Sequence, residues 1–351
     1  MSLHDLASAP GGGGAWQAPA QPTFRGIVQH SGVPQVENPY LLGGIASVAW
    51  RDIEPANGVF NWDPIERVIR LWASQGKRAA IQVLISATPK VTPITESWDR
   101  SAAMRSRSGP LNDTLPDWLI NLGVPQAPGG TGSASTHQYW NPVFLSACRR
   151  MVNELGSRFD GRPEILWTYA AVGCDGRTAL EDSTPLSSAS GPARGILWGT
   201  VGYTEARWLE TVCSMLSFYR AAFEVTPTVA QITHPFLRQP EERPGRATVY
   251  VRESGCTTSA VSELLTYART MRMWVEFDCR STDFPPAEPE WRSGTMVVNP
   301  RHSASQQGRP VMADLHRIVS MGASYALVHA TDLSSPRNYP ALEWASKGAT
   351  Y

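Results

Sequence analysis

Eight short apolar runs recur along the chain, and most of the segments between them carry apolar residues at helical spacing. Strand-like runs that alternate with helices are typical of α/β proteins with a parallel sheet. The runs span residues 23–30, 43–50, 78–86, 164–173, 226–234, 247–255, 272–279 and 323–333. Eight such repeats predict a (β/α)₈ TIM barrel, with a doubly wound open sheet as the alternative. No Gly-rich phosphate loop follows any run, which favours the barrel.

The segment after the second run gives the clearest helix. Asp63 is placed to cap it, Pro64 occupies the first helical position and Glu66 completes a capping box. Five apolar residues then recur at i, i+3, i+4, i+7 and i+8 before Gly76 ends the pattern. They are Ile65, Val68, Ile69, Trp72 and Ala73.

The pattern is weakest in two places. Between the fifth and sixth runs lies only "PFLRQPEERPGR", which is too short and too rich in Pro for a full helix. Residues 87–138 are rich in Pro, Ser, Gly and Thr, and we expect them to form a long loop over the C-terminal face of the barrel. The expected organisation is a flexible tether over residues 1–22 and one catalytic barrel domain over residues 23–351.

Charge and hydropathy restrict the partners. Lys and Arg balance Asp and Glu at 31 each, so no basic field exists to attract nucleic acid. No run approaches the roughly 18 apolar residues of a membrane helix, so no membrane partner is expected. The five cysteines form no CxxC pair, which argues against a disulfide framework or a zinc site. We expect no metal and no other cofactor, and the sequence leaves the oligomeric state open.

The first 22 residues lack the basic start and the apolar core of a secretory leader. The default expectation is therefore a cytoplasmic protein. An extracellular or virion-associated location follows if a leader was trimmed or if export is non-classical.

Polar and ionisable residues follow the apolar runs, at the strand ends where TIM barrels carry their reacting groups. Trp is also frequent, with 13 residues, and a ring beside a turn suits either stacking on a sugar or ordinary packing. In chain order the strand-end residues are His30, Trp50, Arg51, Ser86, Cys174, Asp175, His234, Arg252, Glu253, Glu276, Asp278, His329 and Asp332. The sequence thus predicts a polar ring at the mouth of the barrel.

Two stretches resemble the retaining glycoside hydrolases of clan A, which include β-galactosidase-like barrels. "AWRDIEPANGVFNWDPIERVIRLWASQGKRAAIQV" is similar to their second-strand unit. "YWNPVFLSACRRMVNELGSRFDGRPEILWTYAAVG" resembles their third helix running into a fourth strand. The likeness covers most of residues 23–346 as architecture and is specific over about 44–86 and 139–176. It implies a glycosidase that acts on a β-linked oligo- or polysaccharide with two carboxylates and no cofactor.

The clan places an acid/base Glu after the fourth strand and a nucleophile Glu on the seventh. With 272–279 as the seventh strand, the resemblance implies that Glu276 is the nucleophile; a salt-bridged strand residue is the alternative. The usual Asn-Glu pair after the fourth strand is absent, and Cys174-Asp175 stands in its place. Asp175 is the favoured acid/base and Glu181 the second choice, and the remaining alternative is that neither has this role.

The other polar residues at the mouth are expected to bind substrate. For each of them a structural role is the alternative, such as an ion pair of Arg51 with a nearby acid or ordinary packing of a Trp ring. The expected substrate-binding residues are His30, Trp50, Arg51, Trp118, His234, Arg252, Glu253, His329 and Asp332.

Two other functions stay open at this point. The missing Asn-Glu pair is also compatible with a non-catalytic carbohydrate-binding barrel, including a virion-associated one. A metal-dependent barrel hydrolase is weaker, because the sequence has no close-spaced HxH or HExxH pair. Its ligands would have to converge from His234, Glu253, Glu276, His329 and Asp332.

Overall fold

The main sheet of the protein is a closed barrel of eight parallel strands in the order β1-β12-β11-β10-β7-β6-β3-β2. The computed structural model describes residues 24–30, 34–86, 114–128, 136–173, 176–180, 198–233, 237–238, 251–252, 259–278, 294–299, 304–305 and 308–347. The barrel strands are β1 (Gly26–Gln29), β2 (Leu41–Ala49), β3 (Arg78–Leu84), β6 (Ile165–Tyr169), β7 (Thr228–Ile232), β10 (Trp274–Asp278), β11 (Met296–Asn299) and β12 (Tyr325–Val328). The predicted (β/α)₈ barrel is confirmed, and the open sheet is excluded.

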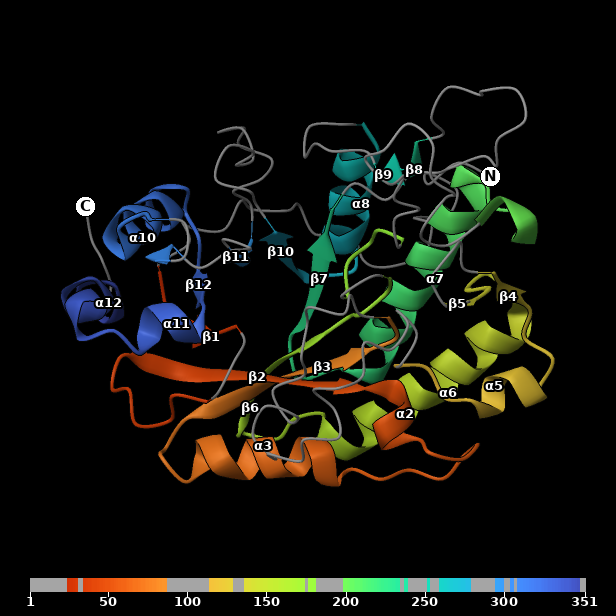
Figure 1. Cartoon of the computed structure of the whole chain (residues 1–351), viewed down its shortest axis with the longest axis horizontal. Coiled ribbons are helices and arrows are strands. Elements are labelled where there is room, and N and C mark those ends of the chain that lie inside the picture. The colour runs from red at the N-terminus through yellow and green to blue at the C-terminus, as the bar shows by residue number, and fades with distance from the viewer. Residues whose placement is uncertain are drawn as a thin grey trace, which may run out of the picture.

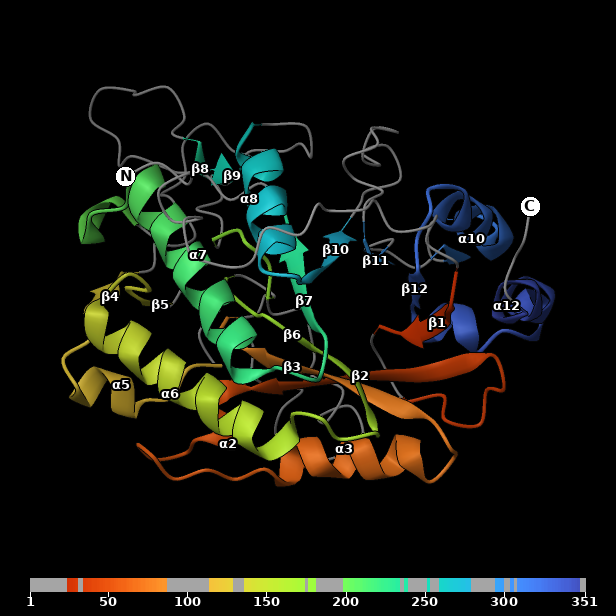
Figure 2. The same ribbon diagram turned by 180° about the vertical axis from the view of Figure 1, so that it is seen from behind.

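Helices surround the barrel, with α3 along β2 and β3 and with α6 beside α7 in both views (Figures 1 and 2). The longer helices are α3 (Asp63–Ala73), α6 (Pro142–Phe159), α7 (Glu205–Ala222), α8 (Ser259–Thr270), α10 (Val311–Ser320) and α12 (Tyr339–Ser346). The short helices are α2 (Trp50–Ile53), α5 (Trp118–Asn121) and α11 (Ala330–Leu333), and the 3₁₀ helices are η1 (Trp198–Val201) and η3 (Pro336–Asn338). Two small two-stranded sheets lie outside the barrel. They pair β4 (Gln126–Ala127) with β5 (Thr136–His137) and β8 (Leu237–Arg238) with β9 (Val251–Arg252).

Glycine lets β2 lie unusually close to its neighbours. A Cβ on Gly43 would lie 1.7 Å from the carbonyl oxygen of Arg78 on β3. A Cβ on Gly44 would lie 2.3 Å from Cζ2 of Trp72 on α3. The pair Gly43-Gly44 therefore permits close contact of the strand with β3 on one side and with α3 on the other.

The prediction of the sixth strand is wrong. Within 247–255 only β9 is described as a strand, and it pairs antiparallel with β8 outside the barrel. A parallel strand needs a crossover of a dozen or more residues, usually helical, and the Pro-rich connection before this run does not supply one. The missing barrel strand is β11, whose four apolar or amide residues follow a Pro-rich segment that the sequence pattern assigns to a loop.

The predicted loop 87–138 is only partly described. Residues 114–128 and 136–138 contain α5 and the antiparallel pair of β4 with β5. Residues 87–113 and 129–135, like the tether predicted over 1–22, lie outside the described residues. Among the helices that the structure describes, none is both long and apolar enough to span a bilayer.

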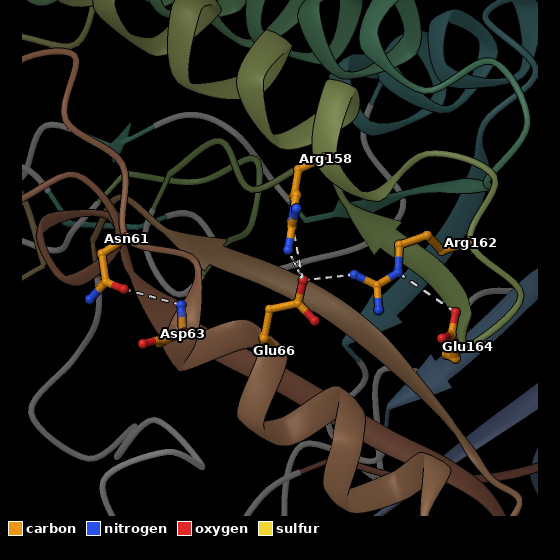
Figure 3. Close-up of polar contacts among 6 residues, drawn as sticks. All are labelled: Asn61, Asp63, Glu66, Arg158, Arg162 and Glu164. Carbon is orange, nitrogen blue, oxygen red and sulfur yellow. Dashed lines mark hydrogen bonds and ion pairs between the residues drawn. The ribbon is translucent and has the colours of Figure 1, made fainter.

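The start of α3 differs from the predicted capping box. The cap position is Trp62, and the N–H of Asp63 donates to Oδ1 of Asn61 at 3.2 Å. Oε1 of Glu66 instead accepts from Arg158 and Arg162, each with a contact of 2.8 Å (Figure 3). Glu66 therefore joins α3 to the C-terminal end of α6, and a long-range ion pair replaces the local cap.

Glu66→Gln is expected to lower the free energy of unfolding by about 1–2 kcal/mol at neutral pH, because the two arginines then donate to a neutral oxygen instead of a charged one. Burial opposes ionisation of Glu66, but the hydrogen bonds from Arg162 and Arg158 outweigh it and lower its pKa. The contribution of such an acid is present above its ordinary pKa and is lost as the pH falls through its folded value.

Urea unfolding of both proteins at neutral and acidic pH measures the effect. The difference should be full at neutral pH and should shrink in acid. Glu154→Gln, on the exposed side of α6, is the matched control and should behave as the wild type. Equal stability of Glu66→Gln and wild type at neutral pH would contradict this role.

Candidate active site

The inside of the barrel changes from apolar to polar along the strands. Side chains of a strand alternate between its faces, so Trp274 and Glu276 belong to one face of β10. At its start, Trp274 stacks on Tyr325 with ring centroids 5.6 Å apart, and Trp167 packs against both rings. These rings fill the N-terminal part of the barrel interior, and the buried polar side chains lie in its C-terminal part.

Glu276 is fully buried in this C-terminal part. Its Oε1 accepts hydrogen bonds from Nε2 of Gln231 at 2.6 Å and from Nδ2 of Asn299 at 3.1 Å. The donors come from the neighbouring strands β7 and β11, and Gln231 is the register partner of Glu276. Two amide donors to one oxygen favour an ionised carboxylate. The barrel wall therefore holds Glu276 in one orientation.

Tyr169 places a hydroxyl beside this carboxylate. It is the last residue of β6 and is buried. Burial raises the pKa of its phenol well above the ordinary value, and the charge of Glu276 raises it further. The phenol is therefore protonated at neutral pH and offers an O–H donor at the site.

The predicted run 272–279 forms the strand that carries Glu276, but its predicted position as the seventh barrel strand is wrong. Because β9 lies outside the barrel, β10 is the sixth barrel strand and β11 is the seventh. The seventh strand ends in Asn299. The acid thus comes from the strand next to the one that the resemblance implied, and Asn299 contacts it as a donor.

The chain folds back onto the barrel directly after β6. The N–H of Gly173 donates to the carbonyl of Arg177 at 2.7 Å, and Arg177 forms a parallel bridge with Gln231 of β7. The predicted acid/base Asp175 itself lies outside the described residues. Both of its described flanks are therefore fixed at the C-terminal end of the barrel.

Gly176 brings this segment against the side chains around Glu276. Its φ of +82° belongs to the left-handed region that favours glycine. A Cβ on Gly176 would lie 2.6 Å from Nε2 of Gln82 and 3.1 Å from Oε1 of Gln231. Since Gln231 contacts Glu276, the residue that follows Asp175 lies one side chain away from the buried carboxylate.

Several predicted site residues cannot be placed. Asp175, Glu181, His234 and Glu253 lie outside the described residues, and of Arg252 only the backbone in β9 is described. Their roles stay predictions. Arg51 is half-buried in α2, where its N–H donates to the carbonyl of Thr114, and its predicted contact with substrate also stays a prediction.

His30 and His329 meet at the end of the first and last barrel strands. Their rings lie edge to face with centroids 5.1 Å apart. Burial, together with the charges of His329 and Arg177, lowers the pKa of His30 to about 3. His30 is therefore a neutral imidazole at the mouth, suited to hydrogen bonding with hydroxyl groups rather than to carrying charge.

His30→Gln is expected to flatten the acid side of the stability curve. The unfolded chain takes up a proton on His30 near pH 6.5, whereas the folded protein takes it up only near pH 3. Stability therefore falls as the pH drops through this window, with a slope that approaches about 1.4 kcal/mol per pH unit.

Urea unfolding at several values between pH 7 and about pH 4 measures this slope. Gln75→Leu, at an exposed position after α3, changes no titratable group and is the control that should keep the slope of the wild type. A slope of His30→Gln as steep as that of the wild type would show that His30 is not the group that titrates.

The stacking role predicted for Trp50 and Trp118 is wrong, because protein covers both rings. Trp50 is fully buried in α2, and its Nε1 donates to Oε2 of Glu54 at 2.7 Å. Trp118 is 9% exposed and packs edge to face on Trp50, while its Nε1 donates to the carbonyl of Glu54. Glu54 is itself fully buried and paired with Arg150 at 2.5 Å. The two indoles thus enclose an ion pair.

The substrate-binding role predicted for Asp332 is also wrong. The residue is 2% exposed in α11, and its two oxygens accept the N–H groups of Ala304 and Ser305 at 2.9 Å each. The carboxylate is thus hydrogen-bonded to backbone N–H groups, and Asp332 holds the chain that follows β11 in place. No group of three or more His, Cys, Asp or Glu side chains in the described ranges could hold a metal ion.

The sequence pattern does not single out several residues that build the site. Each is a polar residue near the end of an otherwise apolar strand, and each side chain is buried. One such residue is unremarkable, but the same feature on neighbouring strands is a signal for a shared polar layer. The missed residues are Ser47, Gln82, Tyr169, Gln231 and Asn299.

Comparisons with known proteins bear on this barrel. The family model described as beta-galactosidase, of glycoside hydrolase family 42, matches residues 42–170, from β2 to the end of β6. No curated protein sequence matches the chain. Among solved structures, the catalytic domain of beta-amylase from Paenibacillus polymyxa has a TM-score of 0.61 at 11% identity, over 95% of this chain and 100% of that chain. At this identity the second match shows the fold alone.

The family match and the closed parallel barrel define the class of protein, which is a glycosidase built on a TIM barrel. More narrowly, the resemblance to the β-galactosidase-like hydrolases of clan A is confirmed, with the family model matching residues 42–170. A carbohydrate substrate follows from this class.

Proposed function

We propose that the protein is a retaining glycoside hydrolase of a β-linked glycan. Glu276 is the nucleophile and Asp175 the acid/base, with Glu181 as the alternative for the second role. The observation that carries the proposal is a fully buried carboxylate on the inside of the barrel that two amide side chains hold. Burying a charge in a barrel is costly unless it is hydrogen-bonded, so this arrangement suits a functional group better than a packing residue.

The chemistry takes two steps. Glu276 attacks the anomeric carbon, and the bond from this carbon to the glycosidic oxygen breaks as the acid protonates that oxygen. The aglycone leaves as an alcohol, and the sugar remains bound to Glu276 as an ester. The deprotonated acid then takes a proton from water, and the water oxygen displaces Glu276 from the sugar. Tyr169 supports the proposal, because its protonated hydroxyl can donate to a sugar oxygen or to the carboxylate as charge moves.

The order of the strands supports the pairing of the two acids. Only β7 separates β6 from β10 in the barrel. Two steps of about 4.8 Å put the two strand ends about 10 Å apart, and inward-facing side chains shorten this distance. A separation of about 5 Å between the carboxyl groups suits retention, and about 6.5–9.5 Å suits inversion. The β linkage rests on the family resemblance.

Hydrolysis of a panel of aryl α- and β-glycosides, followed by proton NMR of the first product formed, tests this function. Release of a β-configured sugar from a β-glycoside is the expected result. An α-configured first product from the same substrate would contradict retention. Cleavage of α-glycosides alone would contradict the β linkage.

A non-catalytic carbohydrate-binding barrel is the second candidate, and one observation favours it. The seventh strand ends in Asn299, where the clan has its nucleophile. Titration of oligosaccharides into wild type and Glu276→Gln distinguishes the two functions. Sugar binding by both proteins, with no product from either after long incubation, would favour the binding barrel over the hydrolase.

A further inference from the structure

We propose that Ser47, Gln82 and Gln231 form a directional hydrogen-bond relay that holds Glu276 in its ionised form. The three are positioning residues, since they act through Glu276 rather than on the sugar. The inference deepens the proposed function, because Glu276 must be ionised to act as a nucleophile.

The relay is a continuous chain of contacts. Oγ of Ser47 donates to Oε1 of Gln82 at 2.8 Å, and Nε2 of Gln82 donates to Oε1 of Gln231 at 3.4 Å. Nε2 of Gln231 then donates to Oε1 of Glu276 at 2.6 Å. All four side chains are buried, each being 8% exposed or less. The relay therefore runs inside the barrel from β2 through β3 and β7 to β10.

Strand register places each link. Ser47 is the partner of Gln82 in the pairing of β2 with β3, and Gln231 is the partner of Glu276 in the pairing of β7 with β10. The middle link passes over β6, which lies between β3 and β7 in the barrel. The contact between Gln82 and Gln231 thus connects the register pair on one side of β6 with the register pair on the other side.

The chemistry of the last group fixes the direction of the whole chain. An ionised carboxylate only accepts hydrogen bonds, so Gln231 must turn its NH₂ toward Glu276 and its carbonyl toward Gln82. Gln82 must then turn its own NH₂ toward Gln231, which leaves its carbonyl for a donor. Ser47 supplies that donor. A hydroxyl three side chains away therefore sets the orientation of the amide that stabilises the negative charge.

The same relay touches the segment that carries the proposed acid/base. Gly176 packs directly on the link between Gln82 and Gln231, since a Cβ there would lie 2.6 Å from the first and 3.1 Å from the second. Asp175 precedes Gly176 in the chain. The two Gln side chains therefore support the loop of one proposed carboxyl while they orient the other.

A packing role alone does not account for these residues. Burying an amide costs free energy unless the amide is hydrogen-bonded, whereas an apolar side chain of similar size would fill the same space without this cost. The relay uses three polar groups in sequence and delivers its last donor to a single carboxylate oxygen. That arrangement is expected if Glu276 must stay ionised for its function.

The test combines three variants with two measurements. Ser47→Ala removes the first donor, Gln231→Leu removes the last one, and Ser47→Thr keeps the hydroxyl. The pH dependence of kcat/KM on an aryl β-glycoside is the first measurement. The second does not need activity: the ¹³C carboxyl resonance of Glu276, assigned by its loss in Glu276→Gln, is followed as the pH is changed.

We expect kcat/KM to fall about 10- to 100-fold in Gln231→Leu, because a hydrogen bond to a charged group is lost, and several-fold in Ser47→Ala. In both variants the acid limb of the pH profile and the titration of the Glu276 resonance should move to higher pH. Ser47→Thr should restore both toward the wild type. Ser74→Ala and Gln75→Leu, at exposed positions after α3, are the matched controls and should change neither.

The relay would be overturned if both Ser47→Ala and Gln231→Leu fold and the Glu276 resonance in each titrates at the same pH as in the wild type. If Gln231→Leu does not fold, Ser47→Ala with Ser47→Thr decides the question. If no substrate is turned over, the proposed function fails, but the resonance still tests the relay. A shift of the resonance without turnover would support the relay and contradict the hydrolase.

Discussion

Glu276→Gln is expected to lower kcat by about 10⁴-fold or more, because an amide oxygen cannot attack the anomeric carbon as a carboxylate does. The substitution preserves the shape of the side chain. Its carbonyl oxygen can still accept from Gln231 and Asn299, which both donate to Oε1 of Glu276, while its NH₂ group takes the place of the other carboxylate oxygen. Steady-state hydrolysis of an aryl β-glycoside by both proteins measures the loss.

Glu164→Gln is the matched control, since this half-buried acid before β6 pairs with Arg162, away from Glu276. It should keep the activity of the wild type. Thermal unfolding of each variant shows whether the barrel is intact. More than a tenth of the wild-type kcat in a folded Glu276→Gln would exclude Glu276 as the nucleophile.

Asp175→Asn is expected to lower kcat by about 10²- to 10⁴-fold on a glycan, because the leaving oxygen no longer receives a proton. The loss on the first step should be small for a dinitrophenyl glycoside, whose leaving group needs no protonation. Glu181→Gln is the comparison that separates the two candidates. Rates on both kinds of substrate are measured for each variant.

The result assigns the acid/base directly. If Glu181→Gln shows the selective loss and Asp175→Asn does not, the role passes to Glu181. If both variants hydrolyse the glycan at the wild-type rate, neither residue is the acid, and the two-carboxylate mechanism with these residues is contradicted.

The alternation of apolar runs was enough to predict the barrel but not to number its strands. The run 247–255 alternates as a strand should, yet only β9 forms there, paired with β8. The true seventh strand, β11, has only four residues and follows a segment with several Pro residues. Local pattern does not report which segments close a barrel, because closure depends on pairing between distant strands.

The candidate site was predictable in one respect. An acid that follows apolar residues near the end of a run has few reasons to be there other than function, and this singled out Glu276. Its donors could not be predicted in the same way. Gln231 is neutral, so nothing in its run distinguishes it from an ordinary polar strand residue, and Asn299 belongs to β11, which the pattern missed. Only the register across β7, β10 and β11 brings both residues to Glu276.

The errors at Trp50 and Glu66 have one physical cause. Trp50 follows a strand and Glu66 sits three residues after a capping residue, so local rules favour a sugar platform and a capping box. Distant partners decide both positions. The indole of Trp50 donates to Glu54, which is paired with Arg150. The carboxylate of Glu66 pairs with Arg158 of α6 and with Arg162 in the turn that follows.

The most direct test of the central claim is to trap the sugar on the enzyme. A 2-deoxy-2-fluoro β-glycoside with a good leaving group slows the second step of a retaining hydrolase more than the first, so the ester accumulates. Mass spectrometry of the digested protein then identifies the labelled peptide. We predict that the label lies on Glu276. A label on any other residue, or turnover of ordinary glycosides with no label at all, would contradict the account.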